Sequence, residues 1–115
     1  QPLLSSAFAR LALHEGASEA VREESGRVSG ANEMHVCKAF YRQMTWAPVT
    51  AGIPALFLHG KEDGVIPLAE GRLAAAGYEG ESVFRTVPCT SHQLMMEQPE
   101  ETSRLLGALI DNLIA

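Results

Sequence analysis

The sequence predicts an α/β fold built around two parallel strands. Residues 55–58 form a short apolar run without polar alternation, which is typical of a strand buried on both faces of a parallel sheet. Residues 82–87 indicate a second strand, and a helical pattern over 68–76 lies between the two. A strand, a helix and a strand in this order predict a parallel pair joined by a right-handed crossover.

The length and composition are those of one small globular domain. The chain has 115 residues, of which 46% are hydrophobic and 20% charged, with a net charge of -5. A mildly acidic chain argues against a nucleic-acid surface or an anchor on anionic membranes. No apolar run approaches the roughly 20 residues of a membrane span, and no signal-peptide pattern occurs. Because the first residue is Gln rather than Met, we expect an N-terminus that is processed, trimmed or cut from a longer polypeptide.

The two cysteines, Cys37 and Cys89, are too few for a disulfide framework. We therefore expect free thiols in a reducing compartment, which favours a cytoplasmic location. No Cys/His cluster has the spacing of a zinc site, so we expect no metal and no cofactor.

Three helices are expected before the first strand. Apolar residues at helical spacing predict the first over 2–13, and Ser18 is placed to cap a second. The breakers around Gly26 and Gly30 predict that this second helix is short. The third is expected over 32–46, with Asn32 as its cap.

We expect the helix over 68–76 to bury one face against the strands. Pro67 suits its first turn, and Gly77 ends it. The residues expected to point inward are Leu68, Ala69, Leu73 and Ala76.

The clearest helical pattern lies over 99–114. It opens with Pro99 and two glutamates, which suit a first turn, and we expect Glu97 to help cap it. An apolar stripe along this helix predicts a face turned to the core. The stripe consists of Leu105, Leu106, Leu109, Ile110 and Leu113.

An acid and a histidine follow the two predicted strands. Asp63 lies in a tight polar loop after the first strand, where Gly60 can adopt backbone angles closed to other residues. His92 lies in the loop after the second strand. Because the carboxyl ends of parallel strands share one edge of a sheet, we expect the two side chains to meet there. A carboxylate that orients a histidine base is the acid–base half of a Ser/Asp/His device.

Other interpretations of these residues stay open. Glu62 is the rival of Asp63 as the acid, and an Asp before Gly64 is also typical of a simple turn. Taken alone, His92 would be an ordinary surface-loop histidine. His14 is expected to be solvated or packed rather than a ligand.

Two motifs resemble the C-terminal part of the α/β-hydrolase family. They are Leu58-His59-Gly60-x-x-Asp63-x-x-x-Pro67 and Ser91-His92-x-x-x-x-Glu97-Gln98-Pro99. In that family the order along the chain is nucleophile, acid, histidine. The resemblance therefore implies that Asp63 is the acid and His92 the base, and that His59 is structural.

The resemblance also implies a division of the chain. Residues 1–48 would form a helical lid over the active site, the alternative being a packed helical layer, and residues 49–115 would form the core segment. Trp46 and Met95 are then candidates for lining a substrate pocket. Core packing is the alternative for Met95.

The nucleophile of such an enzyme is missing. Gly-x-Ser-x-Gly does not occur in the sequence. The most similar stretch, around Ser18, lacks the second glycine and a preceding buried strand. Members of the family usually have more than twice this length. We therefore expect a C-terminal fragment, or one chain of a split hydrolase, that acts on carboxylic-ester or lipid-like acyl substrates. Relatives with an aspartate nucleophile remain possible.

Such a chain implies a partner. We expect a companion N-terminal polypeptide or self-association, and no activity from this chain alone. The alternative is a non-catalytic interaction module that pairs with another chain through its exposed strand edges.

Overall fold

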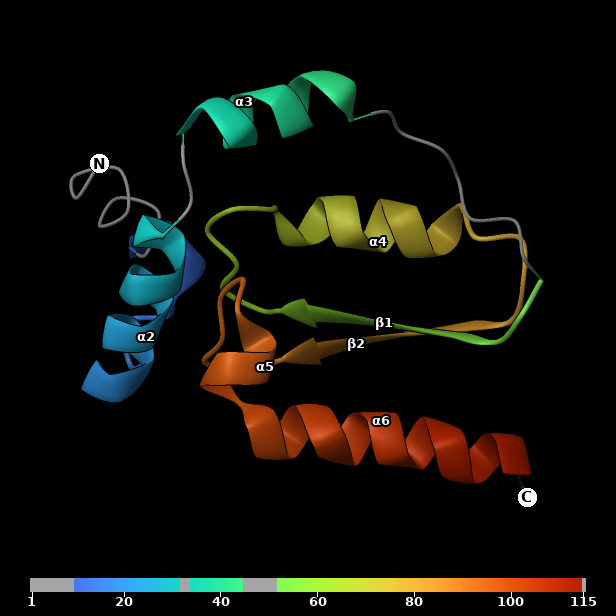
Figure 1. Cartoon of the computed structure of the whole chain (residues 1–115). Coiled ribbons are helices and arrows are strands. Elements are labelled where there is room, and N and C mark those ends of the chain that lie inside the picture. Colours follow the sequence, from blue (N-terminus) through green and yellow to red (C-terminus); the bar gives the residue numbers. More distant parts are fainter. Residues whose placement is uncertain (1–9, 32–33, 45–51, 115) are drawn as a thin grey trace.

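The computed structural model of the chain describes residues 10–31, 34–44 and 52–114. Its elements, in order, are α2 (Glu19–Gly30), α3 (Met34–Gln43), β1 (Ala55–Gly60), α4 (Leu68–Ala76), β2 (Ser82–Val87), α5 (Leu94–Glu97) and α6 (Pro99–Ile114). The two strands lie side by side, with α4 on one face and α6 on the other (Figure 1). This arrangement is the α/β fold that the sequence predicts.

The sheet is parallel, as predicted. Ala55 lies opposite Ser82, and Gly60 lies opposite Val87 at the other end of the pair. Both strands therefore end at the same edge, where the loop after β1 and the loop after β2 come together. A backbone bond of 2.9 Å from Lys61 N to the Val87 carbonyl continues the ladder into the first of these loops.

The α4 helix has the predicted bounds, but its inward face is smaller than predicted. Leu68 is half-buried, whereas Leu73 is 66% exposed and Ala69 and Ala76 are exposed. The described part of the chain puts only two strands beneath this helix, so the far side of its apolar face extends past the sheet.

The α2 helix is longer than predicted. Ser18 caps it by accepting a hydrogen bond of 3.3 Å from Val21 N, as expected. The helix continues through Gly26, where the sequence predicts a break. Arg22 holds its first turn by donating to the His14 carbonyl at 2.8 Å. One glycine costs a helix only roughly 1 kcal/mol, so Gly26 alone does not have to end it.

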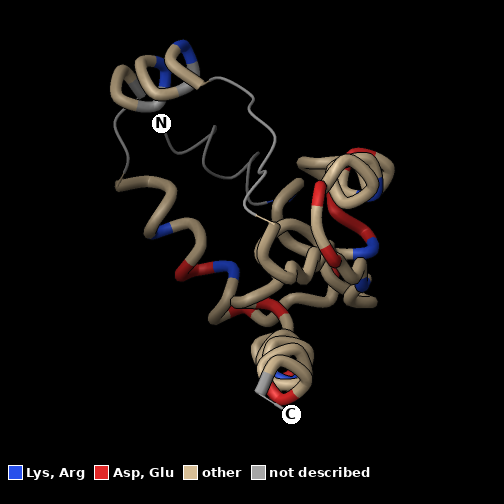
Figure 2. The backbone as a smooth tube through the Cα atoms, turned by 90° about the vertical axis from the view of Figure 1, so that its right-hand side faces the viewer, with Lys and Arg blue, Asp and Glu red and all other residues tan. Residues whose placement is uncertain are grey.

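The α3 helix is shorter than the predicted 32–46, and both Asn32 and Trp46 lie outside the described residues. All the side chains of α3 that the structure describes are exposed. In Figure 2, where charged residues are coloured, α3 lies apart from the strands. Of the predicted helix over 2–13, residues 10–13 are described; residues 10–12 are helical, and Leu13 forms a bend after them.

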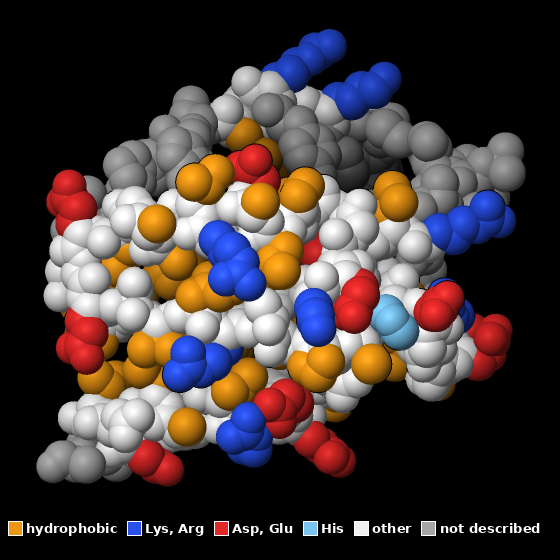
Figure 3. Space-filling view, turned by 180° about the vertical axis from the view of Figure 1, so that it is seen from behind, with side chains coloured by type: hydrophobic (Ala, Val, Ile, Leu, Met, Phe, Trp, Pro, Cys, Tyr) orange, Lys and Arg blue, Asp and Glu red, His pale blue; other side chains and the backbone are white. Residues whose placement is uncertain are grey.

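The described core is thin. The buried apolar side chains are Ala12, Leu13 and Val87. On α6, Leu105 and Leu109 are half-buried, but Leu106, Ile110 and Leu113 are 46%, 55% and 55% exposed. The predicted inward stripe is thus only partly covered, and Figure 3 shows hydrophobic side chains at the surface among Lys and Arg. None of the described helices is long and apolar enough to cross a membrane.

Candidate active site

Asp63 is held by the loop that follows β1. Its Oδ1 atom accepts hydrogen bonds from Val65 N at 2.8 Å and Ile66 N at 2.9 Å. This local turn is the one that an Asp before Gly64 predicts. It leaves the second oxygen of Asp63, Oδ2, free to meet a side chain from elsewhere.

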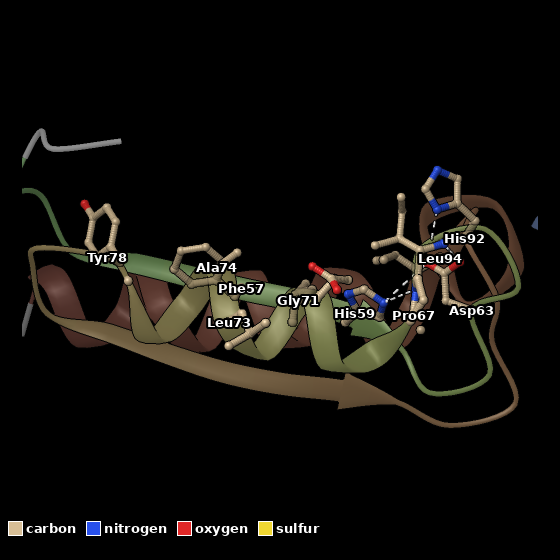
Figure 4. Close-up of a pocket in the computed structure, with 15 residues that line it drawn as sticks. Phe57, His59, Asp63, Pro67, Gly71, Leu73, Ala74, Tyr78, His92 and Leu94 are labelled. Carbon is tan, nitrogen blue, oxygen red and sulfur yellow. Dashed lines mark hydrogen bonds and ion pairs between the residues drawn. The ribbon is translucent and has the colours of Figure 1, made fainter. Parts of the chain in front are cut away.

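That side chain is His92, from the loop after β2. His92 Nδ1 lies 3.0 Å from Asp63 Oδ2 (Figure 4). Because an ionised carboxylate can only accept, Nδ1–H is the donor, and in the neutral ring this assignment leaves Nε2 without a proton. The ring is 37% exposed and the carboxylate 5%, so the acid is buried and the opposite nitrogen of the ring is accessible.

The hydrogen bonds around the carboxyl group of Asp63 favour its ionised form. Burial opposes its charge and would by itself raise its pKa. The hydrogen bonds from Ile66 N, the His92 ring and Val65 N outweigh burial and lower the pKa below the usual value. A carboxylate that remains charged can stabilise an imidazolium beside it.

A second histidine adjoins the same carboxylate. His59 Nε2 donates to the Ile66 carbonyl at 2.9 Å and lies 3.5 Å from Asp63 Oδ2. Its ring stacks on Phe84 at a centroid distance of 6.4 Å. These three contacts join the acid loop and both strands around the His59 ring, in keeping with the structural role predicted for it; its closeness to Asp63 was not predicted.

Gly60 is needed for a different reason from the one predicted. Its φ is not positive; among the described glycines only Gly52 has a positive φ. A Cβ on Gly60 would instead lie 1.8 Å from Ser91 O and 2.7 Å from Thr90 O. The glycine therefore allows the backbone that precedes His92 to cross directly over the end of β1.

The rival acid, Glu62, faces the same loop at a different point. Its Oε2 atom accepts from Thr90 N at 3.3 Å, and its own N–H donates to the Thr90 carbonyl at 3.0 Å. The structure thus places Asp63, and not Glu62, against His92.

Glu97 was expected at the start of α6, but its carboxylate points back to the His92 loop. It accepts from Ser91 N, Gln93 N and His14 N. Glu97 ends the short helix α5, which the sequence analysis missed because four residues carry no detectable period. Its partners lie on two separate segments, so only the tertiary structure could identify them.

Residues 11–14 are also part of the site, although they belong to the predicted lid segment. The Leu11 carbonyl accepts from Ser91 Oγ at 2.6 Å, and the Ala12 carbonyl accepts from His92 N at 2.9 Å. Ser91 Oγ in turn accepts from Gly64 N at 3.1 Å. One buried hydroxyl thus joins this segment, the His92 loop and the Asp63 loop.

A cavity of about 910 Å³ adjoins the pair. It runs along β1 and α4, from Tyr78 at one end to Asp63 and His92 at the other, and its lining is mostly apolar (Figure 4). Leu94 lines it, a residue that the sequence analysis did not single out. Met95, which it did single out, is 60% exposed and is not among the lining residues.

The other predicted pocket residue, Trp46, lies outside the described residues. In the described ranges no group of three His, Cys, Asp or Glu side chains could hold a metal ion. Cys89, in the loop between β2 and His92, is a free and exposed thiol.

The fold closely matches solved hydrolase structures. An esterase from Exiguobacterium antarcticum, EaEST, aligns with 96% of this chain at a TM-score of 0.78 and 16% identity. A serine hydrolase involved in carbazole degradation, the CarC enzyme, aligns with 96% at a TM-score of 0.75 and 16% identity. No protein-family model matches the sequence, and no curated protein matches it by sequence.

This chain has the fold of the C-terminal part of an α/β-hydrolase. It spans 42% of the esterase and 47% of the serine hydrolase, less than half of either. The similarity in fold thus agrees with the family that the two sequence motifs resemble. The thin core and the exposed apolar stripe of α6 are what part of such a fold would present.

Proposed function

We propose that this chain supplies the acid and the base of a hydrolase whose nucleophile lies on the remaining half of the fold. The observation that carries the proposal is the 3.0 Å contact between Asp63 Oδ2 and His92 Nδ1. The other half would belong to a longer form of the polypeptide or to a companion chain.

In the complete enzyme, His92 Nε2 would remove the proton from a serine hydroxyl as its oxygen attacks the carbonyl carbon of an ester. The same nitrogen would then pass that proton to the departing alcohol. Water would attack the acyl-enzyme in the second half-reaction, with His92 again as base and Asp63 stabilising its imidazolium. If the nucleophile were an aspartate, His92 would act only on the water.

Carboxylic esters or lipid-like acyl compounds are the proposed substrates. The mostly apolar lining of the cavity beside His92 supports an apolar substrate group. The similarity in fold to an esterase supports the reaction class. Part of residues 1–48, including α3 and Trp46, would act as a lid, and Met95 could contact substrate from its edge. The free, exposed thiol of Cys89 supports a reducing, cytoplasmic location.

The test is hydrolysis of a short-chain aryl ester, together with an intact-mass search for a companion chain in the native preparation. The chain alone should not exceed the buffer rate, because its sequence has no Gly-x-Ser-x-Gly motif to supply a nucleophile. The complex with its companion should hydrolyse the ester, and His92→Ala should lower kcat by about 10³-fold or more.

Glu101→Gln is the control, since this carboxylate bonds Arg104 on the surface of α6 and lies outside the cavity lining. It should leave the rate of the complex unchanged. His92-dependent turnover by the chain alone would contradict the proposal, because it would place a nucleophile on this sequence. A complex that has no hydrolase activity would also contradict it.

An alternative function is that of a non-catalytic module that pairs with another chain. Within the described residues β1 pairs with β2 alone, so its second edge is unpaired, and Leu106, Ile110 and Leu113 of α6 are exposed. An unpaired edge and an apolar face both favour association. An inactive complex in which His92→Ala changes nothing would support this alternative.

A further inference from the structure

We propose that Glu97 is a positioning residue that orients His92 by holding the backbone on both sides of it. The inference rests on the proposed function, since it assigns Glu97 to the Asp63–His92 pair. Glu97 is not among the residues that line the cavity, and its carboxylate accepts from backbone N–H groups rather than from the His92 ring. It acts through the N–H groups of the residues that precede and follow His92.

The contacts of the Glu97 carboxylate surround His92 in the sequence. Ser91 N lies 3.2 Å from both carboxylate oxygens, and Gln93 N lies 3.1 Å from Oε2. Hydrogen bonds to a charged acceptor are stronger than those to a neutral one. The Cα atom of His92 is thereby fixed from both sides.

The Glu97 carboxylate also binds residues 12–14, whose Ala12 carbonyl accepts from the backbone of His92 and Gln93. We call Glu97 and the Ala12 carbonyl together the clamp. His14 N lies 2.5 Å from Glu97 Oε1, and the nearby Ala12 carbonyl accepts from His92 N at 2.9 Å and Gln93 N at 3.2 Å. All three N–H groups of residues 91–93 are therefore satisfied by Glu97 and Ala12. Without Glu97, the N–H groups of residues 91–93 would keep only their bonds to Ala12, and Ser91 would also keep the hydrogen bonds of its hydroxyl to Leu11 and Gly64.

A carboxylate is the group that this position requires. Three N–H donors converge on two oxygens that carry no hydrogen, and both oxygens are used. An amide has one accepting oxygen, and its NH₂ group would face an N–H donor. Glutamine would therefore lose part of the clamp while keeping the size of the side chain.

The clamp bears on His92 because the carboxylate of Asp63 is held by hydrogen bonds from its own loop, although the bond from Gly64 N to Ser91 Oγ also joins the two loops. Val65 N and Ile66 N hold Asp63, and neither belongs to the His92 loop. Any shift of residues 91–93 therefore changes the 3.0 Å separation of His92 Nδ1 from Asp63 Oδ2. The short α5 turn, with Glu97 N bonded to the Gln93 carbonyl at 2.9 Å, returns the carboxylate to this place.

The test is NMR of the full chain with ¹⁵N-labelled histidine. His92 should show a downfield Nδ1–H proton that disappears in Asp63→Asn. In Glu97→Gln we expect this proton to move upfield and to exchange with water on the order of tenfold faster, as for the loss of one hydrogen bond. Glu97→Ala should remove the signal. The ring signals of His59 report whether the sheet and the acid loop stay folded.

The matched control is Glu101→Gln, which removes a carboxylate on α6 that bonds Arg104. It should leave the His92 proton unchanged. An unchanged His92 proton in folded Glu97→Gln overturns the inference, as does loss of the His59 signals together with those of His92. If Glu97→Ala does not fold, Glu97→Gln decides.

If Asp63→Asn leaves the proton in place, the proposed acid–base pair itself is wrong and both proposals fall. If only the Glu97 variants fail to alter the proton, the proposed function stands.

Discussion

The backbone of Ser91, in the loop that carries His92, crosses directly over Gly60, the last residue of β1. The position of a Cβ on Gly60 lies 1.8 Å from the Ser91 carbonyl oxygen, which no side chain could occupy. The end of β1 and the residue before His92 are thus in direct backbone contact. The distance between Asp63 and His92 depends on this contact, since each follows one of the two residues closely in the sequence.

Replacing Gly60 with alanine should therefore separate the two loops. We expect Gly60→Ala to lower the free energy of unfolding by about 1–3 kcal/mol or more, since the clash is with backbone that cannot rotate away. Urea denaturation measures this change. Gly26→Ala in α2 is the control, because nothing lies within 4 Å of its Cβ position. That control should stabilise the chain by up to about 1 kcal/mol. Equal stability of Gly60→Ala and the unaltered chain would contradict the close crossing.

Gly71 leaves room for the His59 ring. A Cβ on Gly71 would lie 2.3 Å from His59 Nδ1, and the ring, with 11% of its side chain exposed, is enclosed. Gly71→Ala should displace the ring and weaken its bond to the Ile66 carbonyl, at a cost of about 1–3 kcal/mol. Denaturation and the ¹⁵N shifts of His59 check this. Gly107→Ala on α6, with nothing within 4 Å, should leave those shifts unchanged.

The lowered pKa of Asp63 makes stability depend on pH with a definite sign. A carboxyl group whose pKa falls on folding stabilises the native state above its unfolded pKa, about 3.9 for Asp. That contribution should be lost as the pH falls through the lower pKa of the folded state. Urea unfolding of the chain and of Asp63→Asn between pH 7 and pH 3 measures it. The difference between the two should shrink as the pH falls; a constant difference would contradict the ionised, hydrogen-bonded Asp63.

The exposed stripe of α6 should matter for association rather than for the fold of the chain alone. Ile110→Glu places a charge on a side chain that is 55% exposed. We expect the free energy of unfolding of the isolated chain to change by no more than about 0.5 kcal/mol. Association with a companion or a second copy should weaken, as sedimentation would detect. Ser103→Glu, exposed on the same helix, is the control. Unaltered association in Ile110→Glu would exclude this face from the interface.

The bounds of β2, α4 and α6 and the start of β1 could be predicted because their signals are local; β1 continues through Gly60, two residues beyond the apolar run 55–58. An apolar run ends at His59-Gly60, proline opens a helix, and a leucine stripe repeats every three or four residues. The meeting of Asp63 and His92 also followed from sequence, since parallel topology brings the ends of neighbouring strands to one edge. These properties need only chain order and the period of a strand or helix.

Most of the features that could not be predicted depend on neighbours distant along the chain; the continuation of α2 through Gly26 is an exception. Leu73 is exposed because no further described strand lies beneath α4. Gly60 is required by the approach of Ser91 and not by its own backbone angles. Glu97 binds His14, which is 83 residues away.

The sequence by itself therefore determined the fold class, the bounds of most of the C-terminal elements and the two residues that face each other at the sheet edge. Only the tertiary structure decided how those residues are held: by the crossing at Gly60, the second histidine beside Asp63 and the carboxylate of Glu97. The physical reason is that the hydrophobic period of a helix or strand and the type of a turn are determined by residues close together in the sequence. A hydrogen-bond partner or a steric limit exists only once remote segments have packed together.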